Sequence, residues 1–168
     1  MTQNHALYQK SSKASLKIAS LNIKGRRCSE IDKWMHIPQL MHENNFAILA
    51  VQETHLTDDL ADQFKNLFST RLTLHFSPDP HSRNVRGVTL VLNKKHIKTE
   101  NVKEMVIIPG RAIPINVPWQ DNKKINILAI YAPNVLEWVN QQPRHILDWL
   151  SDQLVCLDCW VLVQLVVL

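Results

Sequence analysis

The hydrophobic residues of this chain gather in short runs, and several of these runs end in polar side chains. The runs cover residues 16–22, 46–54, 87–93 and 125–134. Their length and their content of branched apolar residues are typical of buried strands. The run at 125–134 is expected to be the last strand. A half-buried strand is predicted from Arg71, where polar and apolar residues alternate in RLTLHFS.

Two helices are predicted between these strands, because apolar residues recur there at the spacing of a helical face. The first helix is marked by Ile31, Trp34, Met35 and Met41. Pro38 lies among them and either kinks this helix or opens its second piece. The second helix is marked by Leu60, Phe64, Leu67 and Phe68. A later helix is expected to begin at Pro143.

The coarse order of elements is strand, helix, strand, helix and then mostly strands. This order predicts a layered α/β sandwich with mixed sheets, in one domain over residues 16–150. Residues 1–15 are polar and aperiodic and are expected to form a disordered tail. Residues 151–168 are strongly apolar and are interpreted as an aberrant tail. They are shorter than the roughly 20 residues of a membrane-spanning helix, so a membrane anchor is not expected.

Charge, cysteine and glycine content narrow the function classes. The net charge of +4 and the pI near 9.1 favour contact with polyanions. The three cysteines have no framework spacing and there is no signal-peptide core, so an intracellular chain, nuclear or cytoplasmic, is expected rather than a secreted one. Cys156 and Cys159 lack a second ligand pair, which argues against zinc. The glycines are far apart, so no phosphate-binding glycine-rich loop and no nucleotide cofactor are expected.

Three polar residues at the ends of predicted strands could carry chemistry: Asn22, Glu53 and Tyr131. The carboxylate of Glu53 is a hard oxygen ligand suited to magnesium, and the amide of Asn22 can hydrogen-bond a phosphate or a second carboxylate. The hydroxyl of Tyr131 can donate to a developing oxyanion. Together they suit phosphoryl chemistry. Each is also explained as an ordinary residue, as a turn amide, a solvated acid or an amphipathic core side chain.

The sequences of four segments, and their order along the chain, resemble those of a known family. LKIASLNIKG, AILAVQETHL, RGVTLVLN and INILAIYAPN occur in the order of the endonuclease/exonuclease/phosphatase superfamily, which includes the apurinic endonucleases and DNase I. The chain most resembles the endonuclease domain of non-LTR (LINE-type) retrotransposons, over about residues 16–150. The resemblance implies a DNase I-like fold and a hydrolase that nicks DNA with Mg²⁺ or Mn²⁺. It implies that Glu53 and Asn22 serve the metal site and that Tyr131 contacts the scissile phosphate.

The chain also departs from the family pattern. Lys24 stands where some members carry an aspartate, and neither a GDFN-type nor an SDH-type motif follows the YAPN segment. The resemblance therefore implies that residues 16–150 are the N-terminal part of such a domain. Glu53 alone is expected to bind the metal weakly. The chain is expected to be an incomplete and inactive fragment of a DNA endonuclease.

Basic residues beside the predicted site are candidates for contact with DNA phosphates. They are Lys24 and Arg26 after the first strand, and Arg83 and Arg86 before the strand at 87–93. Each is also explained as part of a solvated basic surface. Two other functions stay open: a non-catalytic remnant that binds nucleic acid, and a superfamily member that acts on phospholipid or another phosphoester. The basic charge balance favours DNA over lipid.

Overall fold

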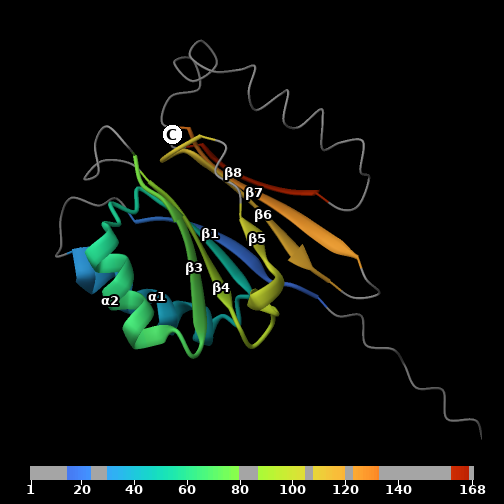
Figure 1. Cartoon of the computed structure of the whole chain (residues 1–168), viewed down its shortest axis with the longest axis horizontal. Helices are drawn as coiled ribbons and strands as arrows, with labels where there is room; N and C mark the ends of the chain where they lie inside the picture. Colours follow the sequence, from blue (N-terminus) through green and yellow to red (C-terminus); the bar gives the residue numbers. More distant parts are fainter. Residues whose placement is uncertain are drawn as a thin grey trace, which may run out of the picture.

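The computed structural model describes residues 15–23, 30–79, 87–104, 108–119, 123–132 and the backbone of 160–166. In these ranges the chain forms two sheets of four strands each, packed face to face, with two helices on the outer face of the first sheet (Figure 1). Pairing in each sheet is parallel in one place and antiparallel in the others, as predicted for mixed sheets. The predicted layered α/β sandwich is therefore confirmed.

The first sheet has the strand order β1-β2-β4-β3. Its strands are β1 (Ile18–Asn22), β2 (Ile48–Gln52), β3 (Leu72–Ser77) and β4 (Val88–Asn93). The helices that cover it are α1 (Glu30–Glu43) and α2 (Asp58–Phe68). The second sheet has the order β5-β6-β7-β8. It comprises β5 (Lys103–Glu104), β6 (Ala112–Pro118), β7 (Lys124–Ala132) and β8 (Trp160–Val166), and a 3-10 turn, η1 (Thr99–Asn101), precedes it.

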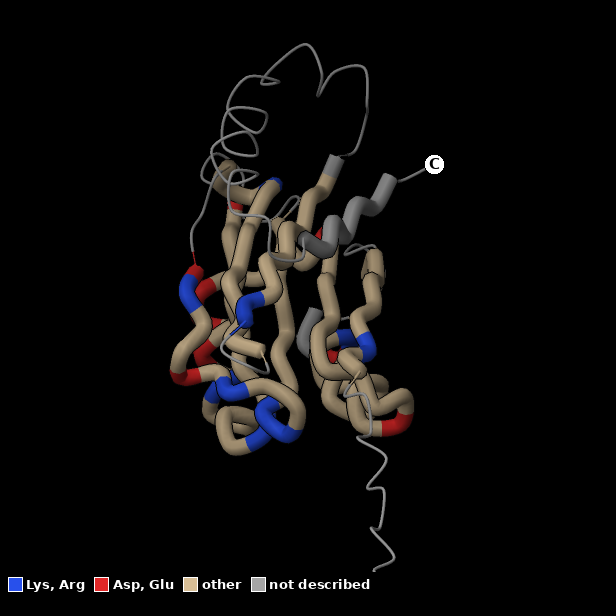
Figure 2. The backbone as a smooth tube through the Cα atoms, turned by 90° about the vertical axis from the view of Figure 1, so that its right-hand side faces the viewer, with Lys and Arg blue, Asp and Glu red and all other residues tan. Residues whose placement is uncertain are grey.

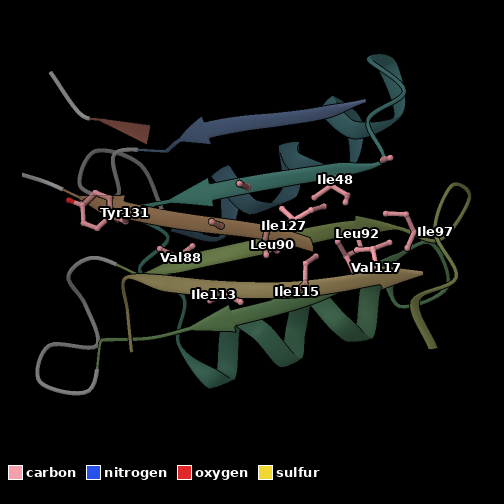
Figure 3. Packing of buried hydrophobic residues seen from close by; sticks show 13 residues of the cluster. Ile48, Val88, Leu90, Leu92, Ile97, Ile113, Ile115, Val117, Ile127 and Tyr131 are labelled. Atoms are coloured by element: carbon pink, nitrogen blue, oxygen red, sulfur yellow. The ribbon is translucent and has the colours of Figure 1, made fainter. Parts of the chain in front are cut away.

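Strand β2 is buried along its whole length because both of its faces are covered. Since side chains alternate along a strand, Ile48 and Ala50 face the second sheet. Leu49 and Val51 face the helices. The core between the sheets is shown in Figure 3, where Tyr131 lies at one end and Ile97 at the other. This explains why β2 is apolar up to its last residue, the buried Gln52.

The helices follow the predicted positions, but their buried faces differ in detail. Helix α1 runs through Pro38 as one element rather than two. Its core face is Trp34, Ile37 and Met41, spaced three and four residues apart, whereas Met35 is 43% exposed. In α2 the buried positions are Ala61 and Phe64, and Leu67 is 57% exposed. Met35 and Leu67 thus lie in the predicted helices but are exposed, because an apolar residue beside a helical stripe can face solvent.

Two strand predictions also need correction. The first strand, β1, is half-buried rather than buried, since it is one of the two edge strands of its sheet. The run at 125–134 is not the last strand, because β8 pairs in parallel with β7 from the apolar stretch 151–168. The helix expected from Pro143 and the tail at 1–15 lie outside the described residues, apart from residue 15. Neither of the two described α-helices is long and apolar enough to cross a membrane.

Candidate active site

Asn22 and Glu53 meet because the strands that carry them are parallel neighbours. In the pairing of β1 with β2, Asn22 lies beside Gln52, so the two strands finish at the same end of the sheet. The Asn22 amide nitrogen Nδ2 donates a hydrogen bond of 3.1 Å to Glu53 Oε1. A carboxylate at the end of a buried strand thus has a neutral donor beside it.

Tyr131 reaches the same carboxylate from the second sheet. Its hydroxyl donates to Glu53 Oε1 across 3.3 Å. The residues that precede Glu53 and Tyr131 are also linked, because the buried Gln52 side-chain amide donates a hydrogen bond of 2.9 Å to the Ile130 carbonyl oxygen. Asn22, Glu53 and Tyr131, each predicted at the end of a strand, therefore meet at one end of the sandwich, and their chemical roles stay predictions. Both of these bonds to Glu53 are made to Oε1, and among the described residues no hydrogen bond to Oε2 is found.

The turn that carries Glu53 has an unusual backbone. Glu53 has φ 49° and His55 has φ 46°, both in the left-handed region that side chains other than glycine seldom adopt. The residue between them, Thr54, is held from two sides. The Trp34 indole nitrogen donates to its carbonyl oxygen at 3.3 Å, and its own amide donates to the Gly87 carbonyl oxygen at 3.4 Å. Strain of this kind persists only where the surroundings fix the conformation, and it often occurs at functional sites.

Gly87 makes room for this turn. It has φ 99°, and a Cβ added there would lie 2.6 Å from Thr54 Oγ1. A side chain at this position would therefore need both a strained backbone and a displaced threonine. From sequence, Gly87 was only the start of a strand. A lone glycine between a polar loop and a strand is a recognised signal of close backbone approach, and it could have indicated this role.

We expect Gly87→Ala to lower the free energy of unfolding by about 1–3 kcal/mol, because it combines a left-handed backbone with the contact to Thr54 Oγ1. The measurement is chemical denaturation of both proteins. In a Thr54→Ala background the same change is expected to cost less, since the clashing oxygen is gone. An equal cost in both backgrounds would show that the contact with Thr54 plays no part.

A second close-packed corner lies at the same end of the sandwich, and sequence analysis did not identify it. Val88 pairs with Ser77 on one side and with Gln52 on the other. The last residue of β3 therefore lies at the same end of the sheet as Glu53. The Gly110 amide donates to Ser77 Oγ at 2.8 Å, and a Cβ on Gly110 would lie 2.7 Å from the Cα of Asp79. Asp79 is buried. This corner joins the two sheets beside the candidate site.

The donor set fits a magnesium ion only in part. Magnesium is usually bound by one or two carboxylates and keeps several waters and substrate oxygens, so Glu53 with the neighbouring Asn22 is a minimal protein contribution. Within the described ranges, no three histidine, cysteine, aspartate or glutamate side chains come together. The candidate DNA contacts Lys24, Arg26, Arg83 and Arg86 lie outside the described residues, as do Asn134 and the cysteines Cys156 and Cys159.

No family model and no curated protein matches the chain, whereas many solved structures do. An AP endonuclease from Leishmania major has a TM-score of 0.56 at 17% identity, over 82% of this chain and 46% of that one. An endonuclease/exonuclease/phosphatase family protein from Leptotrichia buccalis has a TM-score of 0.58 at 14% identity, over 88% and 65%.

TDP2 from D. rerio, in complex with a single-strand DNA product, has a TM-score of 0.56 at 12% identity, over 88% of this chain and 58% of that one. The chain thus spans roughly half to two thirds of the length of these proteins. Their identities are low, so the likeness is one of architecture. It agrees with the two layered mixed sheets and the outer helices described above. The chain therefore has the DNase I-like fold of the endonuclease/exonuclease/phosphatase proteins.

Proposed function

We propose that this chain is the N-terminal part of a metal-dependent phosphodiesterase domain that nicks DNA, of the kind carried by non-LTR retrotransposons. The observation that supports this is the Glu53 carboxylate, held by Asn22 and Tyr131 where the two sheets meet. In this proposal the chain acts inside the cell, in the nucleus or the cytoplasm. The 168 residues by themselves are an incomplete and inactive form of the site.

Each of the three side chains has a distinct role in this proposal. Glu53 holds Mg²⁺ or Mn²⁺ through Oε2, and Asn22 keeps the carboxylate oriented by its bond to Oε1. When bound, the ion neutralises charge on the phosphate. Tyr131 lies beside Glu53 with a hydroxyl that can donate to a phosphate oxygen once the substrate is present. Because Asn22 and Tyr131 are neutral, they add no negative charge that would repel a phosphodiester.

DNA is the substrate that the observations favour over lipid. The chain is basic, with a net charge of +4, which suits a polyanion. The RGV and YAPN segments resemble those of retrotransposon endonucleases rather than those of phospholipid-cleaving members. Among proteins of the same fold, the Leishmania major protein is an AP endonuclease and the D. rerio TDP2 structure holds a single-strand DNA product.

Manganese binding tests the proposal at Glu53. We expect electron paramagnetic resonance of Mn²⁺ to show weak binding to the chain, and Glu53→Gln to weaken it by about tenfold or more. Glu100→Gln changes an exposed acid in η1 and is the matched control, expected to leave binding unchanged. A short DNA duplex is expected to tighten Mn²⁺ binding, because phosphate oxygens complete the coordination shell.

Two results would contradict this assignment. Equal Mn²⁺ binding by the unmodified chain and Glu53→Gln would remove Glu53 from the metal site. Tightening by vesicles that contain a phosphoinositide, with none by DNA, would favour the phospholipid alternative. DNA binding with no Mn²⁺ binding at all would support the non-catalytic remnant.

A further inference from the structure

A pocket of about 410 Å³ opens at the end of the first sheet that is farthest from Glu53. It lies between the last turn of α1, the turn from α2 into β3, and the end of β4. Its lining residues are Pro38, Met41, His42, Thr70, Arg71, Leu72, Asn93, Lys94 and Lys95. Pro38 is partly exposed and, with the nearly buried Leu72 and with the fully buried Met41 beneath, forms an apolar floor. This volume lies in the range of small-ligand sites.

The topology separates this pocket from the candidate active site. Strand β4 runs antiparallel to β2, so its last residue, Asn93, lies beside the start of β2. The backbone amide of Asn93 donates a hydrogen bond of 2.9 Å to the Ala47 carbonyl oxygen. Glu53 follows the other end of β2. At roughly 3.3 Å per residue, the two places are about 15–20 Å apart. A ligand in the pocket therefore does not touch the Glu53 carboxylate.

One rim of the pocket is strongly basic. Arg71, Lys94 and Lys95 are exposed, and among the described residues none of them forms an ion pair and no acidic side chain lines the pocket. In Figure 2, Lys and Arg segments gather at this lower end of the layer formed by the first sheet and its helices. Such a concentration of one charge beside an apolar floor attracts an anion that also has an apolar part.

The backbone holds this rim in place. The Lys94 amide donates to the Arg71 carbonyl oxygen at 2.9 Å, which joins the two turns that carry the cations. The Asn93 side chain accepts from the Lys95 amide at 3.0 Å and donates to the Phe46 carbonyl oxygen at 3.1 Å. The Arg71 guanidinium lies 5.8 Å from the centre of the Phe68 ring. The cations are therefore attached to a preorganised surface, which lowers the entropic cost of binding.

We propose that this pocket binds single-stranded nucleic acid, with one unstacked base on the apolar floor and consecutive phosphates along Arg71, Lys94 and Lys95. Each phosphodiester carries one negative charge, so three cations match a run of phosphates better than one small anion. A duplex keeps its bases paired and stacked, and cannot place one on the floor. The site is separate from the proposed function, because it needs neither a metal ion nor Glu53.

Fluorescence anisotropy with a labelled oligo(dT) strand, in EDTA, tests this proposal on the whole chain. We expect Lys94→Gln/Lys95→Gln to weaken binding about tenfold and to reduce the slope of log K against log salt by about 1.4, since two phosphate contacts are lost. Lys103→Gln/Lys124→Gln removes the same charge from exposed positions of the second sheet and is expected to change binding less than twofold. All four lysines are exposed, and circular dichroism checks the fold of both variants.

Changes in the ligand test the apolar floor without altering the protein. An abasic strand of equal length is expected to bind several-fold more weakly than oligo(dT), and a duplex also more weakly. The assay contains EDTA and needs no metal ion, so failure of the metal proposal leaves this result unaffected. Equal weakening by both lysine pairs would overturn the site, and so would equal affinity for the abasic strand, for the duplex or for thymidine monophosphate.

Discussion

A supercoiled plasmid incubated with the purified 168-residue chain and magnesium is expected to remain supercoiled. The resemblance implies that a complete domain carries a GDFN-type motif after the YAPN strand, and that the aspartate of this motif takes part in activating water. In the structure, β7 lies between β6 and β8, and Leu165 of β8 pairs with Tyr131. The sequence there, WVLVQLV, has no acid. Among the described residues, β8 therefore supplies no acid beside Tyr131, where the resemblance implies a water-activating aspartate.

The expected loss is large because residues of a catalytic site act as a unit. One missing general base or oxyanion donor typically costs on the order of a hundredfold or more in rate. The assay follows conversion of supercoiled to open-circular plasmid, with an AP endonuclease on an abasic plasmid as the positive control. Nicking that is present in the unmodified chain and absent in Glu53→Ala would overturn this prediction and would show that Glu53, Asn22 and Tyr131 suffice.

Trp34→Ala is expected to lower the free energy of unfolding by about 3–5 kcal/mol, the usual cost of removing a buried aromatic side chain. Trp34 is 2% exposed, and its ring meets Phe64 edge to face at a centroid distance of 5.6 Å. It also donates the bond to the Thr54 carbonyl oxygen that holds the turn after Glu53. For a chain of this length the melting temperature is expected to fall by about 6–20 °C.

Two variants separate the contributions to this loss. Trp34→Phe keeps most of the packing and loses the hydrogen bond to Thr54, so a cost of about 2 kcal/mol or less is expected. Met35→Ala changes the next residue of the same helix, which is largely exposed, and is expected to stay within about 0.5 kcal/mol. Similar losses for Trp34→Ala and Met35→Ala would mean that helix propensity, and not the core contact, sets the cost.

The pattern of apolar residues predicted the part of the site that depends on local signals. A run of apolar residues that ends in a polar side chain is visible without knowledge of the fold, and this placed Asn22, Glu53 and Tyr131 at strand ends. Their meeting at one carboxylate follows from the parallel pairing of β1 and β2 and from the packing of β7 across the sandwich. Neither this pairing nor this packing can be seen in the periodicity of the sequence.

The features that were missed depend on contacts between distant parts of the chain. A lone glycine such as Gly87 can indicate a close backbone approach, but nothing local identifies Thr54 Oγ1 as its neighbour, or Asp79 as the neighbour of Gly110. The apolar run that forms β8 reads equally well as a strand or as an aberrant tail, because a short continuous run has no distinguishing period. Its identity as a strand rests on the pairing with β7.

The position of Glu53 between the two sheets couples ligand binding to the stability of the whole sandwich. The carboxylate belongs to the first sheet and the Tyr131 hydroxyl that bonds it belongs to the second. An ion held only by the folded chain adds RT ln(1 + [ion]/Kd) to the free energy of unfolding, about 0.4 kcal/mol at the dissociation constant and about 2.7 kcal/mol at a hundred times that concentration. The melting temperature therefore measures occupancy of this site, even in a protein that cleaves nothing.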